Sequence, residues 1–218
     1  MTVSIAPSIL SANFLRLEEE IRAVEAAGAD LIHMDIMDGH FVPNLTIGPM
    51  IVKAVRAVTA LPLDVHLMIE NADLFVGPFA EAGSDIITIH VETGYHHFRT
   101  LDLIKSYGKK AGISLNPATA LSVIKESISV IDLLLIMTVN PGFGGQRYIP
   151  SMTKKIAEAR AMIDASGRDI ELEVDGGVKE ENAAEIAGAG AGILVMGTEI
   201  FLAEDYVKKI RDVRKKLS

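Results

Sequence analysis

The most informative stretch of this chain is Ala29-Asp30-Leu31-Ile32-His33-Met34-Asp35-Ile36-Met37-Asp38-Gly39-His40. Its apolar beginning indicates a buried strand, and alternate side chains of a strand point to the same face. His33, Asp35 and Met37 therefore share one face near the end of this strand. An imidazole and a carboxylate placed side by side in this way suit a divalent metal ion.

The same arrangement occurs at two later points in the chain. In Leu63-Asp64-Val65-His66-Leu67-Met68, the alternate residues Asp64, His66 and Met68 face one way. A third strand with a polar carboxyl end is expected at Leu172-Glu173-Val174-Asp175-Gly176-Gly177. Three strands that each end in a potential ligand indicate the mouth of a parallel barrel, where active sites form at the carboxyl ends of the strands.

Apolar, β-branched runs alternate with amphipathic stretches eight times along the 218 residues. This alternation predicts a (β/α)8 TIM barrel formed by one domain, residues 1–218, and a doubly wound open sheet is the alternative that it permits. Gly28, Gly83 and Gly108 stand where helices are expected to end. The expected strands are Val3–Leu10, Leu31–Met37, Leu63–Met68, Ile86–His90, Lys110–Leu115, Leu133–Val139, Glu171–Val174 and Gly192–Met196. The expected helices are Arg16–Ala27, Met50–Thr59, Ala72–Ala82, Phe98–Tyr107, Ser122–Ser127, Met152–Ala165, Glu180–Ala189 and Tyr206–Leu217.

Composition narrows the class of protein. The chain has no cysteine, so a metal would have to be bound by His and carboxylate groups. A net charge of −8 argues against a nucleic-acid partner, but backbone N–H groups can still bind a phosphorylated metabolite. Met1-Thr2-Val3-Ser4 has no basic region typical of a signal peptide, and runs such as Leu133–Met137 are too short to cross a membrane. A cytoplasmic enzyme is therefore expected.

Four strand-end residues, His33, Asp35, His66 and Asp175, form a candidate metal site with two imidazoles and two carboxylates. A lone histidine is better explained as a buried, hydrogen-bonded residue, but two at strand ends beside other inward-facing side chains favour a metal. Mixed nitrogen and oxygen donors suit Zn²⁺, Fe²⁺, Mn²⁺ or Co²⁺. These residue types do not rank the four metals, and we take one Zn²⁺ per chain as the first expectation.

Glycines follow three consecutive strands. Val139-Asn140-Pro141-Gly142-Phe143-Gly144-Gly145-Gln146 comes after the sixth strand, Asp175-Gly176-Gly177 ends the seventh, and Met196-Gly197-Thr198 ends the eighth. Each glycine alone would be explained by a tight turn. Together they predict a phosphate pocket, because the loops after strands seven and eight usually bind phosphate in this architecture.

Two aspartates around one metal, with a phosphate pocket nearby, indicate proton transfer next to a carbonyl group. The metal would stabilise an enediolate, while one carboxylate removes a proton and the other returns one to the opposite face. Ser8 is either a substrate hydrogen-bonder or an ordinary buried hydroxyl, and His90 and Glu92 end the fourth strand without an assigned role. Core filling is the simpler explanation for each of three further strand-end residues taken alone, Met37, Met68 and Met137.

Over essentially its whole length the chain resembles the ribulose-phosphate 3-epimerase family. The most specific matches are Asp35-Ile36-Met37-Asp38-Gly39-His40-Phe41-Val42-Pro43-Asn44 and Asn140-Pro141-Gly142-Phe143-Gly144-Gly145-Gln146. The other matching segments are Ala6–Ala12, His33–Pro49, Asp64–Met68, Leu115–Thr119, Met137–Gln146 and Glu173–Gly177.

The resemblance implies a ribulose-phosphate-binding barrel that interconverts D-ribulose 5-phosphate and D-xylulose 5-phosphate by inversion at C3. It implies a homo-oligomer that acts in the pentose phosphate pathway, with Asp35 and Asp175 as the acid and base. It further implies that Ser8 and His66 touch the sugar. The methionines that would wall the enediolate are Met37, Met68 and Met137. The residues that would line the substrate and phosphate site are Gly142, Phe143, Gly144, Gly145, Asp175, Gly176, Gly177, Gly197 and Thr198.

The chain departs from the usual family pattern at several positions. Thr198 stands where Ser is usual and keeps the hydroxyl group, whereas Arg147 and Glu199 carry charges where small or neutral residues are common. Gly192 stands where Asp is common, and Ala120 where Pro is common. These differences bear on substrate preference rather than on the class of reaction.

Three rival functions differ in what they require. A hexulose-6-phosphate 3-epimerase, such as one for D-allulose 6-phosphate, shares this scaffold, and assays with both sugars would separate the two. A sugar-phosphate lyase or decarboxylase of related barrels uses Asp-x-Lys-x-x-Asp, but Asp64-Val65-His66-Leu67-Met68-Ile69 contains no lysine. A non-catalytic sugar-phosphate sensor would not need two proton-transfer carboxylates.

Overall fold

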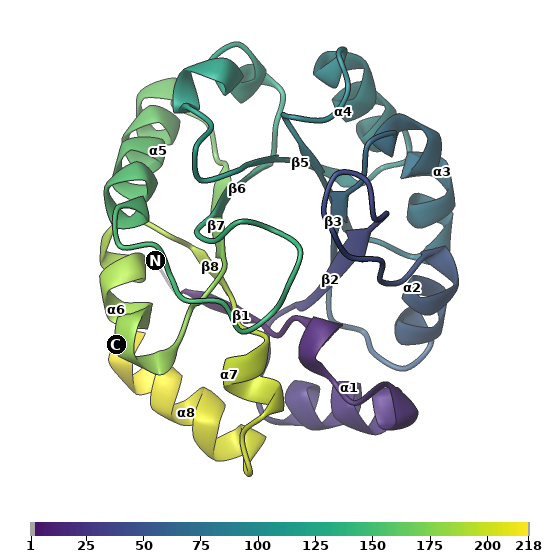
Figure 1. The fold of residues 1–218 in the computed structure, drawn as a ribbon, viewed down its shortest axis with the longest axis vertical. Helices are drawn as coiled ribbons and strands as arrows, with labels where there is room; N and C mark the ends of the chain where they lie inside the picture. Colours follow the sequence, from purple (N-terminus) through teal and green to yellow (C-terminus); the bar gives the residue numbers. More distant parts are fainter. Residues whose placement is uncertain (1–2, 218) are drawn as a thin grey trace.

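The computed structural model describes residues 3–217 and contains eight parallel strands inside a ring of helices (Figure 1). This arrangement confirms the (β/α)8 barrel. Met1, Thr2 and Ser218 belong to the domain expected over residues 1–218 but lie outside the described residues. Met1 and Thr2 are also part of the N-terminal segment that was not expected to be a signal peptide. The strands are β1 (Ser4–Ala6), β2 (Ile32–Met37), β3 (Leu63–Met68), β4 (Ile86–His90), β5 (Lys110–Leu115), β6 (Leu133–Met137), β7 (Glu171–Asp175) and β8 (Ile193–Val195).

Amphipathic helices form the outer layer, and one expected helix is absent from it. Residues 122–127 form parts of two 3₁₀ turns, η3 (Leu121–Ile124) and η4 (Ser127–Ser129), because this short, serine-rich and β-branched segment has low helix propensity. Gly28, Gly83 and Gly108 do follow helix ends, each with a positive φ. The helices are α1 (Leu17–Ala26), α2 (Pro49–Arg56), α3 (Ala72–Ala82), α4 (His97–Ser106), α5 (Met152–Ser166), α6 (Glu180–Gly188), α7 (Thr198–Phe201) and α8 (Tyr206–Leu217).

The ring closes between β1 and β2. The His33 N–H donates to Pro7 O over 3.0 Å, and Ser8 forms an isolated parallel bridge with His33. The expected first strand, Val3–Leu10, was therefore too long: β1 ends at Ala6, Pro7 has no N–H for a ladder, and Ile9–Ser11 turns into the 3₁₀ helix η1. Because β1 also pairs with β8, the sheet is not the open, doubly wound alternative.

Strand alternation separates two buried layers. Ile32, Met34 and Ile36 belong to the apolar layer between the barrel and its helices, whereas His33 and Asp35 alternate with them and point the other way, into the barrel. The interior is therefore polar at the ends of several strands. Among residues 3–217, no helix has the length and apolar character needed to cross a bilayer.

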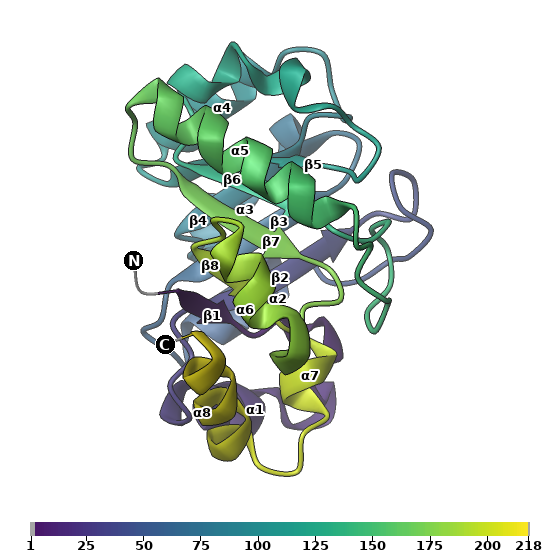
Figure 2. The same cartoon turned by 90° about the vertical axis from the view of Figure 1, so that its left-hand side faces the viewer.

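The loops after β2 and β6 project from the same end of the barrel (Figure 2). They are joined there by a hydrogen bond of 2.8 Å from Asn44 Nδ2 to Gly142 O. This end, where the carboxyl ends of the strands meet, is the expected position of an active site in this fold.

Candidate active site at the mouth of the barrel

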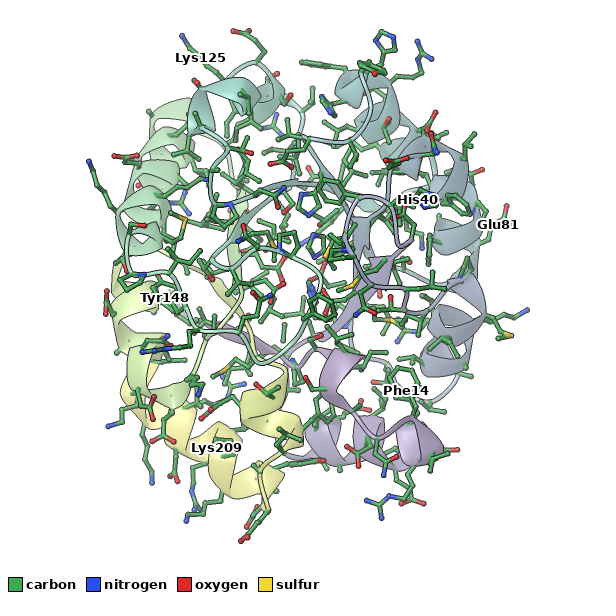
Figure 3. All side chains as sticks on the ribbon, viewed as in Figure 1. Phe14, His40, Glu81, Lys125, Tyr148 and Lys209 are labelled. Carbon is green, nitrogen blue, oxygen red and sulfur yellow. The ribbon has the colours of Figure 1, made fainter. Side chains whose placement is uncertain are left out.

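The strand register brings the predicted metal ligands together. His33 on β2 is opposite Asp64 on β3, and Asp35 is opposite His66. Asp175, at the end of β7, completes a group of four with His33, Asp35 and His66, whose ligand atoms all lie within 4.8 Å of one another. Figure 3 shows that nitrogen, oxygen and sulfur atoms gather at the centre of the ring.

The Nδ1 atom of His33 holds this side chain in place inside the barrel. Its Nδ1 lies 2.7 Å from Asp64 Oδ2, and its Nε2 lies 3.3 Å from Asp35 Oδ1 without forming a hydrogen bond. Burial opposes a charge on this imidazole, but the carboxylates of Asp35 and Asp64 outweigh it and raise the pKa of His33 well above its ordinary value. The position therefore favours positive charge.

His66 presents a second unpaired nitrogen to the same point. Its buried Nδ1 has no hydrogen-bond partner and lies 3.5 Å from Asp35 Oδ1, while its Nε2 lies 2.8 Å from His90 Nε2. Burial lowers the pKa of His66 to about 4, so this imidazole is neutral at neutral pH. A neutral imidazole can offer a lone pair to a metal ion.

The two aspartates have contrasting acidities. Burial acts against ionisation of Asp35, but the imidazoles of His33 and His66 outweigh it and hold the pKa of Asp35 well below its ordinary range. Burial, followed by the charge of Asp35, raises the pKa of Asp175 to about 7. The Ser8 hydroxyl donates a hydrogen bond to Asp35 Oδ2. Near neutral pH the site therefore pairs an ionised carboxylate with one that readily carries a proton, which suits acid–base chemistry.

These residues fit a divalent metal ion. Two buried imidazole nitrogens without hydrogen-bond partners, His33 Nε2 and His66 Nδ1, lie within 4.8 Å of oxygens of Asp35 and Asp175. Unpaired buried polar atoms are costly unless they have a ligand. Two carboxylates and two imidazoles are also a donor set typical of Zn²⁺, Fe²⁺, Mn²⁺ or Co²⁺.

A second acidic cluster lies deeper in the barrel, where Asp64 and Glu173 flank His33. Burial and the charge of Asp64 raise the pKa of Glu173 well above its ordinary value. Neither residue was assigned a role from the sequence. Their two-residue spacing from His66 and Asp175 was the available signal, because it places them on the same inward face.

A pocket lies over the four-residue group. Asp35 and Asp175 line it, whereas His33 and His66 do not. Three polar lining residues were not assigned to the site from the sequence, namely Ser11, Gln146 and Lys179. The other predicted substrate-site and wall residues that line the pocket are Ser8, Met37, Met68, Met137, Gly142, Phe143, Gly144, Gly145, Gly176, Gly177, Gly197 and Thr198.

The two unusual charges near the glycine loops occupy different environments. Arg147 is exposed and does not line the pocket. Glu199 is largely buried, and its Oε1 lies 2.9 Å from Lys209 Nζ, which also bonds Glu180 Oε2 at 3.1 Å. Lys209 thus compensates the negative charge of Glu199 beside the loop after β8.

Gly177→Val is expected to raise KM for a phosphorylated substrate about tenfold or more. Gly177 has a φ of +67°, and a Cβ there would lie 2.3 Å from Tyr148 N and 2.8 Å from Tyr148 Cα. A branched residue would therefore push the loop after β6 out of place, and a left-handed backbone costs such a residue about 1–3 kcal/mol. Steady-state kinetics measures the change. Arg147→Ala is the control, and loss of binding in that variant instead would contradict a phosphate site built from backbone donors.

In this (β/α)8 barrel, two carboxylates with oppositely displaced pKa values lie beside two imidazoles under a glycine-lined pocket, a set of groups that suits acid–base chemistry. The sequence model of the Ribulose-phosphate 3 epimerase family matches residues 4–201. The chain therefore belongs to the ribulose-phosphate 3-epimerase family, whose members are isomerases.

Individual relatives agree with this membership. The chain is 53% identical over 213 residues to ribulose-phosphate 3-epimerase from Bacillus subtilis, covering 97% of this chain and 98% of the relative. It is 54% identical over 216 residues to ribulose-phosphate 3-epimerase from Escherichia coli, covering 98% and 96%. The chloroplastic ribulose-5-phosphate-3-epimerase of Arabidopsis thaliana is 51% identical over 214 residues, covering 97% of this chain and 76% of the relative.

Among solved structures, more distant proteins share the fold. 3-Hexulose-6-phosphate synthase from Salmonella typhimurium superposes with a TM-score of 0.71 at 15% identity, covering 100% of this chain and 98% of that one. Orotidine 5'-phosphate decarboxylase from Pyrococcus horikoshii superposes with a TM-score of 0.70 at 13% identity, covering 98% of each chain. At these identities the likeness concerns the barrel alone.

Proposed function

We propose that this protein inverts C3 of D-ribulose 5-phosphate to give D-xylulose 5-phosphate, as a step of the pentose phosphate pathway. The observation that carries the proposal is the pairing of Asp35 and Asp175 in one pocket with pKa values displaced in opposite directions. Inversion through an enediolate needs one group that accepts a proton and another that returns one to the opposite face. Membership of the family supports the same substrate.

In the proposed mechanism the two aspartates exchange the C3 proton. Asp35 is on β2 and Asp175 on β7, so they approach the pocket from different parts of the ring. Asp35 starts ionised and removes the proton from one face, held in place by the hydrogen bond from Ser8. Asp175 starts protonated and delivers a proton to the other face. In the reverse reaction the roles exchange.

We further propose that one divalent metal ion per chain, Zn²⁺ first among the candidates, is held by His33, Asp35, His66 and Asp175. When bound, it would supply positive charge that stabilises the negative oxygen of an enediolate. Residues of the chain would also keep water away from the reacting carbons. Thioether groups from three strand ends exclude water from the reacting carbons, and they belong to Met37, Met68 and Met137.

The phosphate group is proposed to bind among the glycine loops at the other side of the pocket. Gly144 and Gly145 of the loop after β6, Gly177 after β7, and Gly197 and Thr198 after β8 line this region. Glycine allows close approach of backbone N–H groups to an anion, and these donors do not require a basic side chain. This arrangement is compatible with the net charge of −8.

Removal of the metal tests the proposal directly. Protein treated with a chelator is expected to lose epimerase activity on D-ribulose 5-phosphate and to regain it when one equivalent of Zn²⁺, Fe²⁺, Mn²⁺ or Co²⁺ is added. Elemental analysis and a coupled assay follow metal content and turnover together. Full activity without metal would contradict the metal role. Faster turnover of D-allulose 6-phosphate than of the pentose would replace the proposed substrate by the hexulose alternative.

Three wider properties remain proposals as well. Residues 1–218 are proposed to form one domain, which a single cooperative unfolding transition would support. A homo-oligomer is proposed from the family resemblance. Light scattering tests this by measuring the molecular mass in solution. A cytoplasmic location is proposed because the described helices include none able to span a membrane and because the substrate is a phosphorylated sugar.

A further inference from the structure

We propose that Glu92, acting through His90, fixes the tautomer of His66 and so keeps the Nδ1 lone pair of His66 directed at the metal site. This inference rests on the proposed function, since it takes the four-residue group to be a metal site. It gives roles to two residues at the end of β4 that the sequence left unassigned. Glu92 and His90 are positioning residues here, because neither belongs to the four-residue group.

A continuous series of contacts joins His66 to Glu92. His66 Nε2 lies 2.8 Å from His90 Nε2, and His90 Nδ1 lies 2.9 Å from Glu92 Oε2. The planes of the two rings are inclined by 23° and their centroids lie 4.9 Å apart, so the rings are nearly parallel. Both imidazoles are completely buried, and the Glu92 side chain is only 20% exposed.

Only one placement of the ring protons on His90 and His66 leaves a nitrogen of His66 free to bind a metal. A carboxylate only accepts hydrogen bonds, so His90 carries its proton on Nδ1, facing Glu92. The neutral His90 ring then has a lone pair on Nε2, and His66 must donate its own proton from Nε2. The Nδ1 atom of His66 is thereby left without a proton. This is the buried atom that has no hydrogen-bond partner and points at the metal site.

Glu92 is itself fixed in orientation. Its Oε1 accepts a hydrogen bond of 2.7 Å from the backbone N–H of Asn116 and another from the Thr119 hydroxyl. That loop is held by Lys155 of α5, whose Nζ donates to Asn116 O and to Thr119 O at 2.7 Å each. Oε1 thus faces a backbone N–H, which can only donate a hydrogen bond, whereas Oε2 faces His90.

This geometry predicts an unusual effect of a substitution that preserves shape. In Glu92→Gln, the amide oxygen must take the Oε1 position to accept from the Asn116 N–H, which leaves the NH₂ group facing His90 Nδ1. His90 would then carry its proton on Nε2 and donate it to His66, and His66 would carry its proton on Nδ1. That proton occupies the position of the metal. We expect the affinity for Zn²⁺ to fall about 10–100-fold, the range typical of groups that orient metal ligands.

Competition with a chromophoric chelator measures Zn²⁺ affinity in the full-length wild type and in three variants. Glu92→Asp keeps a carboxylate but shortens the side chain, and it is expected to bind Zn²⁺ better than Glu92→Gln. A role in packing alone predicts the opposite order, because Gln has the size of Glu. Glu81→Gln, on the outer edge of α3, makes the same chemical change at an exposed position and is expected to match the wild type (Figure 3).

Long-range ¹H–¹⁵N spectra of the histidines provide a readout that does not depend on activity. After metal removal, His66 is expected to carry its proton on Nε2 in the wild type and in Glu92→Asp, but on Nδ1 in Glu92→Gln. An unchanged tautomer in Glu92→Gln, or Zn²⁺ affinity equal to that of the wild type, would overturn the inference and leave the proposed function intact. A proton on Nδ1 of His66 in Glu92→Asp would overturn it too, even if Glu92→Gln failed to fold. A wild type that binds no divalent metal would remove the metal site and this inference together.

Discussion

Asp175→Asn is expected to lower the turnover number of the epimerase by about 10²–10⁴-fold, the contribution typical of a positioned acid or base. An amide at this position cannot deliver a proton, whereas the wild-type carboxyl, with a pKa raised to about 7 by burial and by the charge of Asp35, carries one readily. The amide oxygen remains a potential ligand, so the metal content is expected to fall less than the activity. Elemental analysis and steady-state kinetics separate the two effects.

Exchange with deuterated water adds a sharper test of this variant. With Asp35 intact, Asp175→Asn is expected to exchange the C3 hydrogen of one epimer without inverting it, while the wild type places deuterium at C3 of its product. Product that fully retains its original C3 hydrogen in the wild type would contradict two separate bases that exchange with solvent. The control is Asp102→Asn, the same change at an exposed position on α4.

His66→Ala is expected to lose metal and activity together. The substitution removes one of the two imidazole nitrogens that face the site, and it also leaves His90 Nε2 without its partner at 2.8 Å. We expect Zn²⁺ affinity to fall by more than about 100-fold, since groups that merely orient a ligand already account for about 10–100-fold. Chelator competition measures the affinity, and the coupled assay measures turnover.

The comparison variant for His66→Ala is His96→Ala, which removes an exposed imidazole before α4. It is expected to keep both metal and activity. If His66→Ala instead kept its metal while losing turnover, His66 would be assigned to the substrate rather than to the metal. Equal losses in the two variants would point to a general effect of histidine removal.

Much of the fold was predictable because hydrophobic alternation is a local property of the sequence. The expected bounds of the third, fourth and fifth strands agree with β3, β4 and β5, whose alternating apolar residues are buried against the helices. The expected bounds of the first strand were wrong because β1 ends at Ala6, Pro7 has no N–H to donate, and Ile9–Ser11 forms the 3₁₀ helix η1. The segment at residues 122–127 has too little helix propensity for an α-helix and forms 3₁₀ turns instead.

The candidate site was predictable only in part, and for a related reason. A period of two places His33, Asp35 and His66 on inward faces, which a single strand can reveal. The partners behind them depend on which residue of one strand lies opposite which residue of the next. The contact of His33 with Asp64 follows from this register, and His90 contacts His66 from a position two residues beyond Thr88, the residue opposite His66. No local pattern determines either contact. Lys155 reaches its carbonyl partners from a helix much later in the chain.

The pairing of β1 with β8 has a consequence for the order in which the protein matures. During synthesis β1 emerges first, but one of its two neighbours, β8, is the last strand to be made. The candidate metal ligands are divided in the same way. His33, Asp35 and His66 come from the first third of the chain, and Asp175 comes from the last third. A nascent chain therefore carries an incomplete set of ligands until β7 has joined the sheet. Tight metal loading would then coincide with completion of the barrel, and a bound ion would stabilise the finished protein by mass action rather than its intermediates.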